Sequence, residues 1–129
     1  MATIMVVDDK KGVLDLYQWI LAVPGCRVTG APDLGAGLEL LQRERPDLVV
    51  LDIGNATPDK MPVLWKLLSV VQGIPVVFAS VFAGYHDYRS WLAAACSKKD
   101  SDFCLMMRTI SDLLGMDFKS QSAWAICCV

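Results

Sequence analysis

Long uninterrupted apolar runs are missing from this chain, although 54% of its 129 residues are hydrophobic. The most apolar region, residues 67–85, is broken by serine, glutamine, glycine and proline, which makes it unsuitable to span a bilayer. Residues 1–4 lack the basic segment with which a signal peptide begins. We therefore expect a cytoplasmic protein with no membrane partner.

A large excess of one charge and a set of metal-binding histidines are also absent. The chain carries 12 basic and 14 acidic residues, a net charge of −2, so no general affinity for nucleic acid is expected. His86 is the only histidine, and its polar neighbours favour a surface residue over a phosphate donor or metal ligand. The five cysteines have no metal-ligand spacing, and we expect reduced thiols that mostly lie in the core.

Short β-rich runs alternate with amphipathic segments along the chain. The runs predict strands at residues 3–7, 26–31, 48–52 and 74–80, with a weak last strand near 95–97. The segments between them predict helices at residues 13–21, 33–45, 61–71, 85–94 and 102–114. This alternation is typical of an α/β fold whose parallel sheet is covered by helices on both faces. We expect a single domain at residues 1–116.

Some side chains and the end of the chain also have a predicted place in this fold. The strand at residues 74–80 is expected to be buried, and Trp19 and Trp65 are expected to pack on their helices. The residues of the last helix that should face inward are Leu105, Met106, Ile110 and Leu113. The apolar tail, residues 117–129, would pack on the domain or a partner, or be a product of cloning or a frameshift.

The stretch Leu48-Val49-Val50-Leu51-Asp52 places a carboxylate directly after four apolar residues. A short run of this kind is typical of a strand that is buried on both faces. Asp52 then stands where the strand leaves the core, and ligands of open α/β sheets bind outside this end of the strands. Asp52 is therefore a candidate functional residue, with a helix cap as the alternative interpretation.

Other polar residues are expected at the same edge of the sheet. Asp8 and Asp9 follow the first predicted strand, and Ser80 ends the fourth. Converging carboxylates repel one another unless a cation neutralises them, and oxygen ligands favour a hard cation such as Mg²⁺. Lys98-Lys99, after the weak last strand, would add an ammonium group. Such a site suits the transfer of a phosphoryl group to Asp52 as nucleophile.

Three stretches carry a resemblance to a known family: residues 4–9, residues 46–53 and residues 75–80. Through them the chain resembles the response-regulator receiver domains of two-component signalling, over about residues 3–114. The resemblance implies a flavodoxin-like, doubly wound sheet of five parallel strands. It also implies that a histidine kinase or phosphotransfer protein phosphorylates Asp52 with Mg²⁺ as cofactor, and that the chain is otherwise not an enzyme.

The resemblance also implies a role for each matching residue. Asp9 would bind the metal directly, Asp8 mostly through water, and Gly54 through its backbone carbonyl, beside Asp52 itself. Ser80 would be the switch hydroxyl. The register of the last helix favours Lys99 as the site lysine, whereas the register of the strand alone would allow Lys98.

The chain departs from the family pattern at several positions. Lys10 stands where the family usually has glutamate, and Asn55-Ala56 replace the usual Met-Pro. Lys10 would either lower the affinity for the cation or be a solvated side chain without effect, and we favour the second interpretation. The segment between Ser80 and Lys99 is shorter than usual by roughly four residues, about one helical turn. We expect the region of the fourth helix and fifth strand to be shortened.

Rival functions follow from these departures. A degenerate receiver would act only as a protein-interaction module that does not depend on phosphorylation. A haloacid-dehalogenase-like hydrolase would need a second aspartate where Gly54 stands, and a flavodoxin would need a phosphate loop after the first strand. We favour the phosphoacceptor, which would signal to an unknown downstream protein and would be able to form a homodimer.

Overall fold

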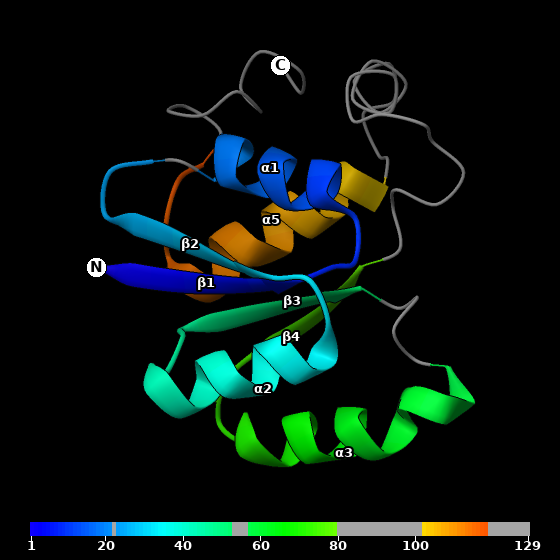
Figure 1. Ribbon diagram of the computed structural model, residues 1–129. Coiled ribbons are helices and arrows are strands. Elements are labelled where there is room, and N and C mark those ends of the chain that lie inside the picture. The colour runs from blue at the N-terminus through cyan, green and yellow to red at the C-terminus, as the bar shows by residue number, and fades with distance from the viewer. Residues whose placement is uncertain (22, 53–56, 80–101, 119–129) are drawn as a thin grey trace.

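The computed structural model describes residues 1–21, 23–52, 57–79 and 102–118, and these residues form a sheet with helices on both faces (Figure 1). The elements in chain order are β1 (Ala2–Val7), α1 (Lys11–Ile20), β2 (Cys26–Ala31), α2 (Leu34–Arg43), β3 (Leu48–Asp52), the 3-10 helix η2 (Pro58–Lys60), α3 (Met61–Val70), β4 (Val76–Ala79) and α5 (Asp102–Leu114). The predicted fourth helix and fifth strand lie outside the described residues, as does the tail beyond residue 118.

The described strands form a parallel sheet in the order β2-β1-β3-β4. In the centre of the sheet, Ile4 pairs with Leu48 and Val7 pairs with Leu51. This strand order is that of the flavodoxin-like doubly wound sheet, so the predicted fold class is confirmed. The chain crosses from β2 back past β1 to β3, which leaves the carboxyl ends of β1 and β3 side by side.

Both faces of β1 and β3 are buried, because each face is covered by a pair of helices (Figure 1). One face packs against α1 and α5, and its strand residues are Ile4, Val6, Leu48 and Val50. The other face packs against α2 and α3, and its strand residues are Met5, Val7, Val49 and Leu51. Since successive side chains alternate between faces, burial on both sides requires the continuous apolar runs seen in the sequence.

Helix α2 approaches the sheet closely at a glycine. The helix begins after Asp33, whose Oδ1 accepts a hydrogen bond of 2.8 Å from the backbone N–H of Ala36. One turn later lies Gly37, where a Cβ atom would stand 3.0 Å from Cγ2 of Val7 and 3.4 Å from Cδ1 of Leu67. The absence of a side chain at Gly37 therefore lets α2 pack directly on β1 and α3.

Several side chains lie elsewhere than the sequence predicted. Trp19 and Trp65 are 50% and 63% exposed, because the buried stripes of α1 and α3 run along other faces of these helices. In α5, Leu113 is 48% exposed, and the inward stripe instead passes through Met107 at 0%. Phe78 is 49% exposed, so the prediction of a buried fourth strand is wrong at that residue.

No helix in the described part of the chain combines the length and the apolar character that crossing a bilayer requires.

Candidate functional site

Two buried carboxylates lie at the carboxyl ends of neighbouring strands. Asp8 directly follows β1, and Asp52 is the last residue of β3; the pairing of Val7 with Leu51 brings the two ends together. The backbone N–H of Asp8 donates to the carbonyl of Ala31 at 3.0 Å, which continues the pairing with β2 and fixes the position of Asp8. Among the described residues, Asp8 and Asp52 are the buried charged ones, at 5% and 8% exposed.

Asp9 joins these two residues in one cluster. One carboxylate oxygen from each of Asp8, Asp9 and Asp52 lies within 4.8 Å of the other two. The side chain of Asp9 is 60% exposed, so the cluster reaches from the edge of the core into solvent. The structure thus brings together the three carboxylates that the sequence placed at one edge of the sheet.

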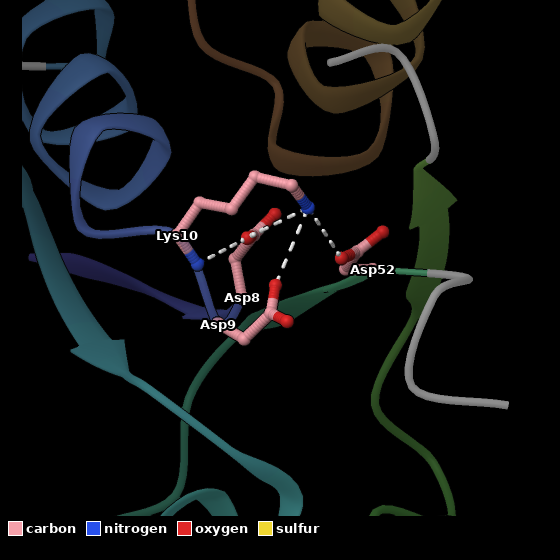
Figure 2. A network of polar contacts seen from close by, with 4 residues as sticks. All are labelled: Asp8, Asp9, Lys10 and Asp52. Carbon is pink, nitrogen blue, oxygen red and sulfur yellow. Dashed lines mark hydrogen bonds and ion pairs between the residues drawn. The ribbon is translucent and has the colours of Figure 1, made fainter. Parts of the chain in front are cut away.

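The ammonium group of Lys10 lies among these three carboxylates (Figure 2). Its Nζ is 3.3 Å from Oδ1 of Asp9, 3.5 Å from Oδ2 of Asp52 and 3.8 Å from Oδ1 of Asp8. The backbone N–H of Lys10 also donates to Oδ1 of Asp8 at 2.9 Å. Lys10 is therefore a member of the cluster as well as a partly solvated side chain, since 49% of it remains exposed. The expectation that it leaves the affinity for the cation unchanged stays a prediction.

The environment of the cluster shifts the pKa of two of its members. Burial raises the pKa of the Asp8 carboxyl from 3.8 to about 6; the hydrogen bond from the Lys10 N–H opposes this rise, and the charge of Asp52 adds to it. Partial burial lowers the pKa of the Lys10 ammonium, but the carboxylates of Asp8, Asp52 and Asp9 outweigh this and raise it. The site therefore holds a carboxylate whose charge is costly in the fold and an ammonium that stays charged.

The charges of the cluster also affect the pKa of a tyrosine in the neighbouring core. Tyr17 of α1 is 1% exposed, and its hydroxyl donates to Sδ of Met106 in α5 at 3.2 Å. Burial raises the pKa of the Tyr17 phenol, and the negative charges of Asp8 and Asp52 raise it further. The phenol is therefore neutral at physiological pH and joins the two helices on this face of the sheet.

The donor atoms of the cluster fit a magnesium ion. Carboxylate oxygens are the hard ligands that Mg²⁺ prefers, and here Asp8, Asp9 and Asp52 offer them from two strand ends. A divalent cation at this position would also reduce the repulsion among the carboxylates. Of the other predicted site residues, Gly54, Ser80, Lys98 and Lys99 lie outside the described residues, as does His86.

Comparison with known proteins gives consistent matches. Residues 4–98 match the family model of the response regulator receiver domain. The probable transcriptional regulatory protein TcrX of Mycobacterium tuberculosis is 32% identical over 92 residues, which cover 71% of this chain and 39% of TcrX. An uncharacterized 14.6 kDa protein of Leptolyngbya boryana is 31% identical over 91 residues, which cover 69% of this chain and 70% of that protein.

A solved structure gives the same result for the fold. The response regulator receiver protein from Burkholderia phymatum superimposes with a TM-score of 0.59 and 25% sequence identity, over 91% of this chain and 98% of that one. The segment that matches the family model contains all four residues of the cluster in Figure 2. The match covers less than half of the length of TcrX, so the likeness concerns only that part of TcrX.

Proposed function

This chain belongs to the family of response regulator receiver domains, and from that premise we propose that Asp52 is its phosphoacceptor. Receiver domains interact with histidine kinases or phosphotransfer proteins and are generally phosphoacceptors without a further enzymatic activity. The observation that supports the proposal for Asp52 is its position: it is buried, ends the central strand β3, and shares a cluster with Asp8 and Asp9.

In the proposed reaction, a carboxylate oxygen of Asp52 attacks the phosphorus of a phosphohistidine on the donor protein. The bond between phosphorus and the histidine nitrogen breaks, and an acyl phosphate forms on Asp52. Asp8 and Asp9, together with Asp52, would hold Mg²⁺, with the backbone carbonyl of Gly54 as a further ligand. The ion would supply positive charge beside the transferring oxygens, where the cluster alone is negative.

The residues around the acyl phosphate would then couple it to a partner. The hydroxyl of Ser80 and the ammonium of Lys99 would bind the new phosphate oxygens. Movement of Ser80 toward the phosphate would change the surface that this part of the chain presents to a downstream protein. In this way one added phosphoryl group would alter a protein-interaction surface.

Phosphorylation of the full chain by acetyl phosphate tests the proposal. With Mg²⁺ present, the mass of the intact wild-type protein should increase by one phosphoryl group, and Asp52→Asn should show no increase. Asp15→Asn is the matched control, because Asp15 is an exposed carboxylate on α1 outside the cluster and should leave labelling unchanged. Equal labelling of wild type and Asp52→Asn would contradict the proposal.

The same experiment separates the phosphoacceptor from the degenerate receiver. A phosphoacceptor loses its labelling when a chelator removes Mg²⁺ and regains it when the ion is restored. A chain that binds no Mg²⁺ at millimolar concentration and takes up no phosphoryl group would instead be an interaction module that works without phosphorylation.

A further inference from the structure

The cluster of carboxylates already contains a cation that belongs to the chain. The Nζ atom of Lys10 lies between 3.3 and 3.8 Å from one oxygen of each of Asp8, Asp9 and Asp52 (Figure 2). Those carboxylates also provide the oxygen atoms that lie within 4.8 Å of one another and can act together as metal ligands. The ammonium group and a divalent ion would therefore use the same oxygens.

We propose that Lys10 is a built-in competitor of the metal ion. Its ammonium occupies the carboxylate cluster when no divalent ion is bound, and it has to leave the cluster when Mg²⁺ binds. The inference rests on the proposed function, in which Mg²⁺ is the cofactor for phosphorylation of Asp52, and it adds that Lys10 sets the Mg²⁺ concentration at which the site fills.

The short distances in the cluster make it unfavourable for Mg²⁺ and the Lys10 ammonium to occupy it together. Mg²⁺ contacts its oxygen ligands at about 2.0–2.1 Å and accepts little departure from octahedral geometry. An ammonium group that stays within 3.3–3.8 Å of the same carboxylates would stand a few ångströms from the ion and would compete with it for the same oxygen atoms. Like charges at such a distance repel strongly in a partly buried site, so binding of Mg²⁺ includes displacement of the ammonium.

The position of Lys10 lets the ammonium leave without disturbing the fold. Lys10 precedes the first residue of α1, and its side chain is 49% exposed. Long lysine side chains have several rotamers that carry the ammonium into water while the stem stays on the protein. The backbone N–H of Lys10, which donates to Asp8 at 2.9 Å, need not move when the side chain turns outward.

The charge balance of the cluster explains why Lys10 also stabilises the metal-free protein. The cluster has three carboxylates and one ammonium, a formal charge of −3 + 1 = −2 when all are ionised. Without Lys10 it would be −3, on two buried groups and one exposed group. Lys10 thus relieves repulsion in the absence of metal, and the same contacts weaken the binding of Mg²⁺.

Removing the ammonium should strengthen binding of Mg²⁺. We expect Lys10→Gln to lower the dissociation constant for Mg²⁺ by about tenfold, a modest effect because Lys10 is half exposed and screened by solvent. Lys10→Arg keeps the positive charge and should bind Mg²⁺ much as the wild type does. Isothermal titration calorimetry of the full chain with Mg²⁺ alone measures all of these constants.

Lys11→Gln is the matched control for the change in net charge. Lys11 is exposed at the start of α1, and within the ranges that the structure covers no ion pair joins it to the cluster. It should therefore leave the dissociation constant within about twofold of the wild type, since exposed charges are well screened. Equal affinities of Lys10→Gln and Lys11→Gln would overturn the inference.

A measurement on the unmodified chain does not depend on any variant folding. Amine acetylation followed by peptide mass analysis should show Lys10 becoming more reactive when Mg²⁺ is added, with Lys11 unchanged. No change in the reactivity of Lys10 at saturating Mg²⁺ would also overturn the inference. The acetyl phosphate assay on the same samples tells the two ideas apart: labelled Asp52 with unaltered Mg²⁺ affinity of Lys10→Gln rejects only the role of Lys10, whereas unlabelled Asp52 rejects the proposed function.

Discussion

The strands β1 and β3 each join two contrasting regions, an apolar centre and a charged carboxyl end. Residues 4–7 and 48–51 are at most 1% exposed and fill the two cores of the domain. The next residues along the same strands bury the carboxylates of Asp8 and Asp52, and burial raises the pKa of Asp8 to about 6. One region stabilises the fold, while the other holds negative charges that the single ammonium of Lys10 balances only in part.

The charged end of each strand depends on the apolar centre beside it. The parallel register of β1 and β3 is set by apolar residues that alternate between two helical layers. That same register carries Asp8 and Asp52 to within reach of one cation. The stability contributed by the centre allows the adjacent end to keep an electrostatically unfavourable arrangement.

The largest change in the free energy of unfolding is expected for a substitution that leaves a cavity in the apolar centre. Leu51 of β3 is 1% exposed and packs in the core formed with α2 and α3, so Leu51→Ala should lower the free energy of unfolding by about 3 kcal/mol. Urea denaturation at neutral pH measures this loss. Val63→Ala is the control, because Val63 is 38% exposed and should cost well under half as much; similar losses would show that burial does not distinguish the two sites.

At the charged end, by contrast, removal of a charge is expected to raise the free energy of unfolding. Between pH 3.8 and about 6, the folded state holds a proton on Asp8 that the unfolded state has released, so the contribution of Asp8 to stability falls as the pH rises through this window. Asp8→Asn should remove this dependence and, in the presence of a chelator, raise the free energy of unfolding at pH 7 by roughly 2 kcal/mol.

The control for this variant is Asp9→Asn, because the side chain of Asp9 is 60% exposed and its carboxylate should cost little in the folded state. Chemical denaturation of both variants and the wild type at pH 4, 5, 6 and 7 supplies the comparison. If Asp8→Asn were less stable than the wild type at pH 7 without metal, the charged end would be a stabilising element and the contrast would fail.

A smaller effect should appear where the helix α2 touches the last apolar residue of β1. A Cβ on Gly37 would lie 3.0 Å from Cγ2 of Val7, so Gly37→Ala should destabilise the domain by about 1–2 kcal/mol. Gly12→Ala in α1, where no atom lies within 4 Å of the added Cβ, should instead stabilise it by about 0.5 kcal/mol. In thermal unfolding, the midpoint temperature should fall for Gly37→Ala and rise for Gly12→Ala. Equal changes in the two midpoints would contradict the close approach of α2 to β1.

The sequence predicted the apolar centre more completely than the charged end. The bounds of β2, β3 and α5 agree with the predicted ranges, because proline, glycine or charged residues stand close to the ends of each element and leave little freedom in where it starts and stops. The exposure of Trp19 and Trp65 was missed, since composition does not reveal which face of a helix the sheet covers.

At the charged end, the sequence identified the carboxylates but not their partner. Asp8, Asp9 and Asp52 follow from one rule, that parallel strands end at the same edge of the sheet. The contacts of Lys10 depend on where a long flexible side chain turns once Asp52 has been brought beside it by folding. The available signal was its place directly after an acidic pair, which put its ammonium within reach of the cluster.

The claim that the ends of β1 and β3 form one cation site is tested most directly by amide NMR spectra of the full chain during a titration with Mg²⁺. The amides of Asp8, Asp9, Lys10 and Asp52 are predicted to shift together with a single dissociation constant, and Asp52→Asn should weaken the response at all of them. Shifts at the end of β1 without shifts at the end of β3, or with a different dissociation constant, would contradict the claim.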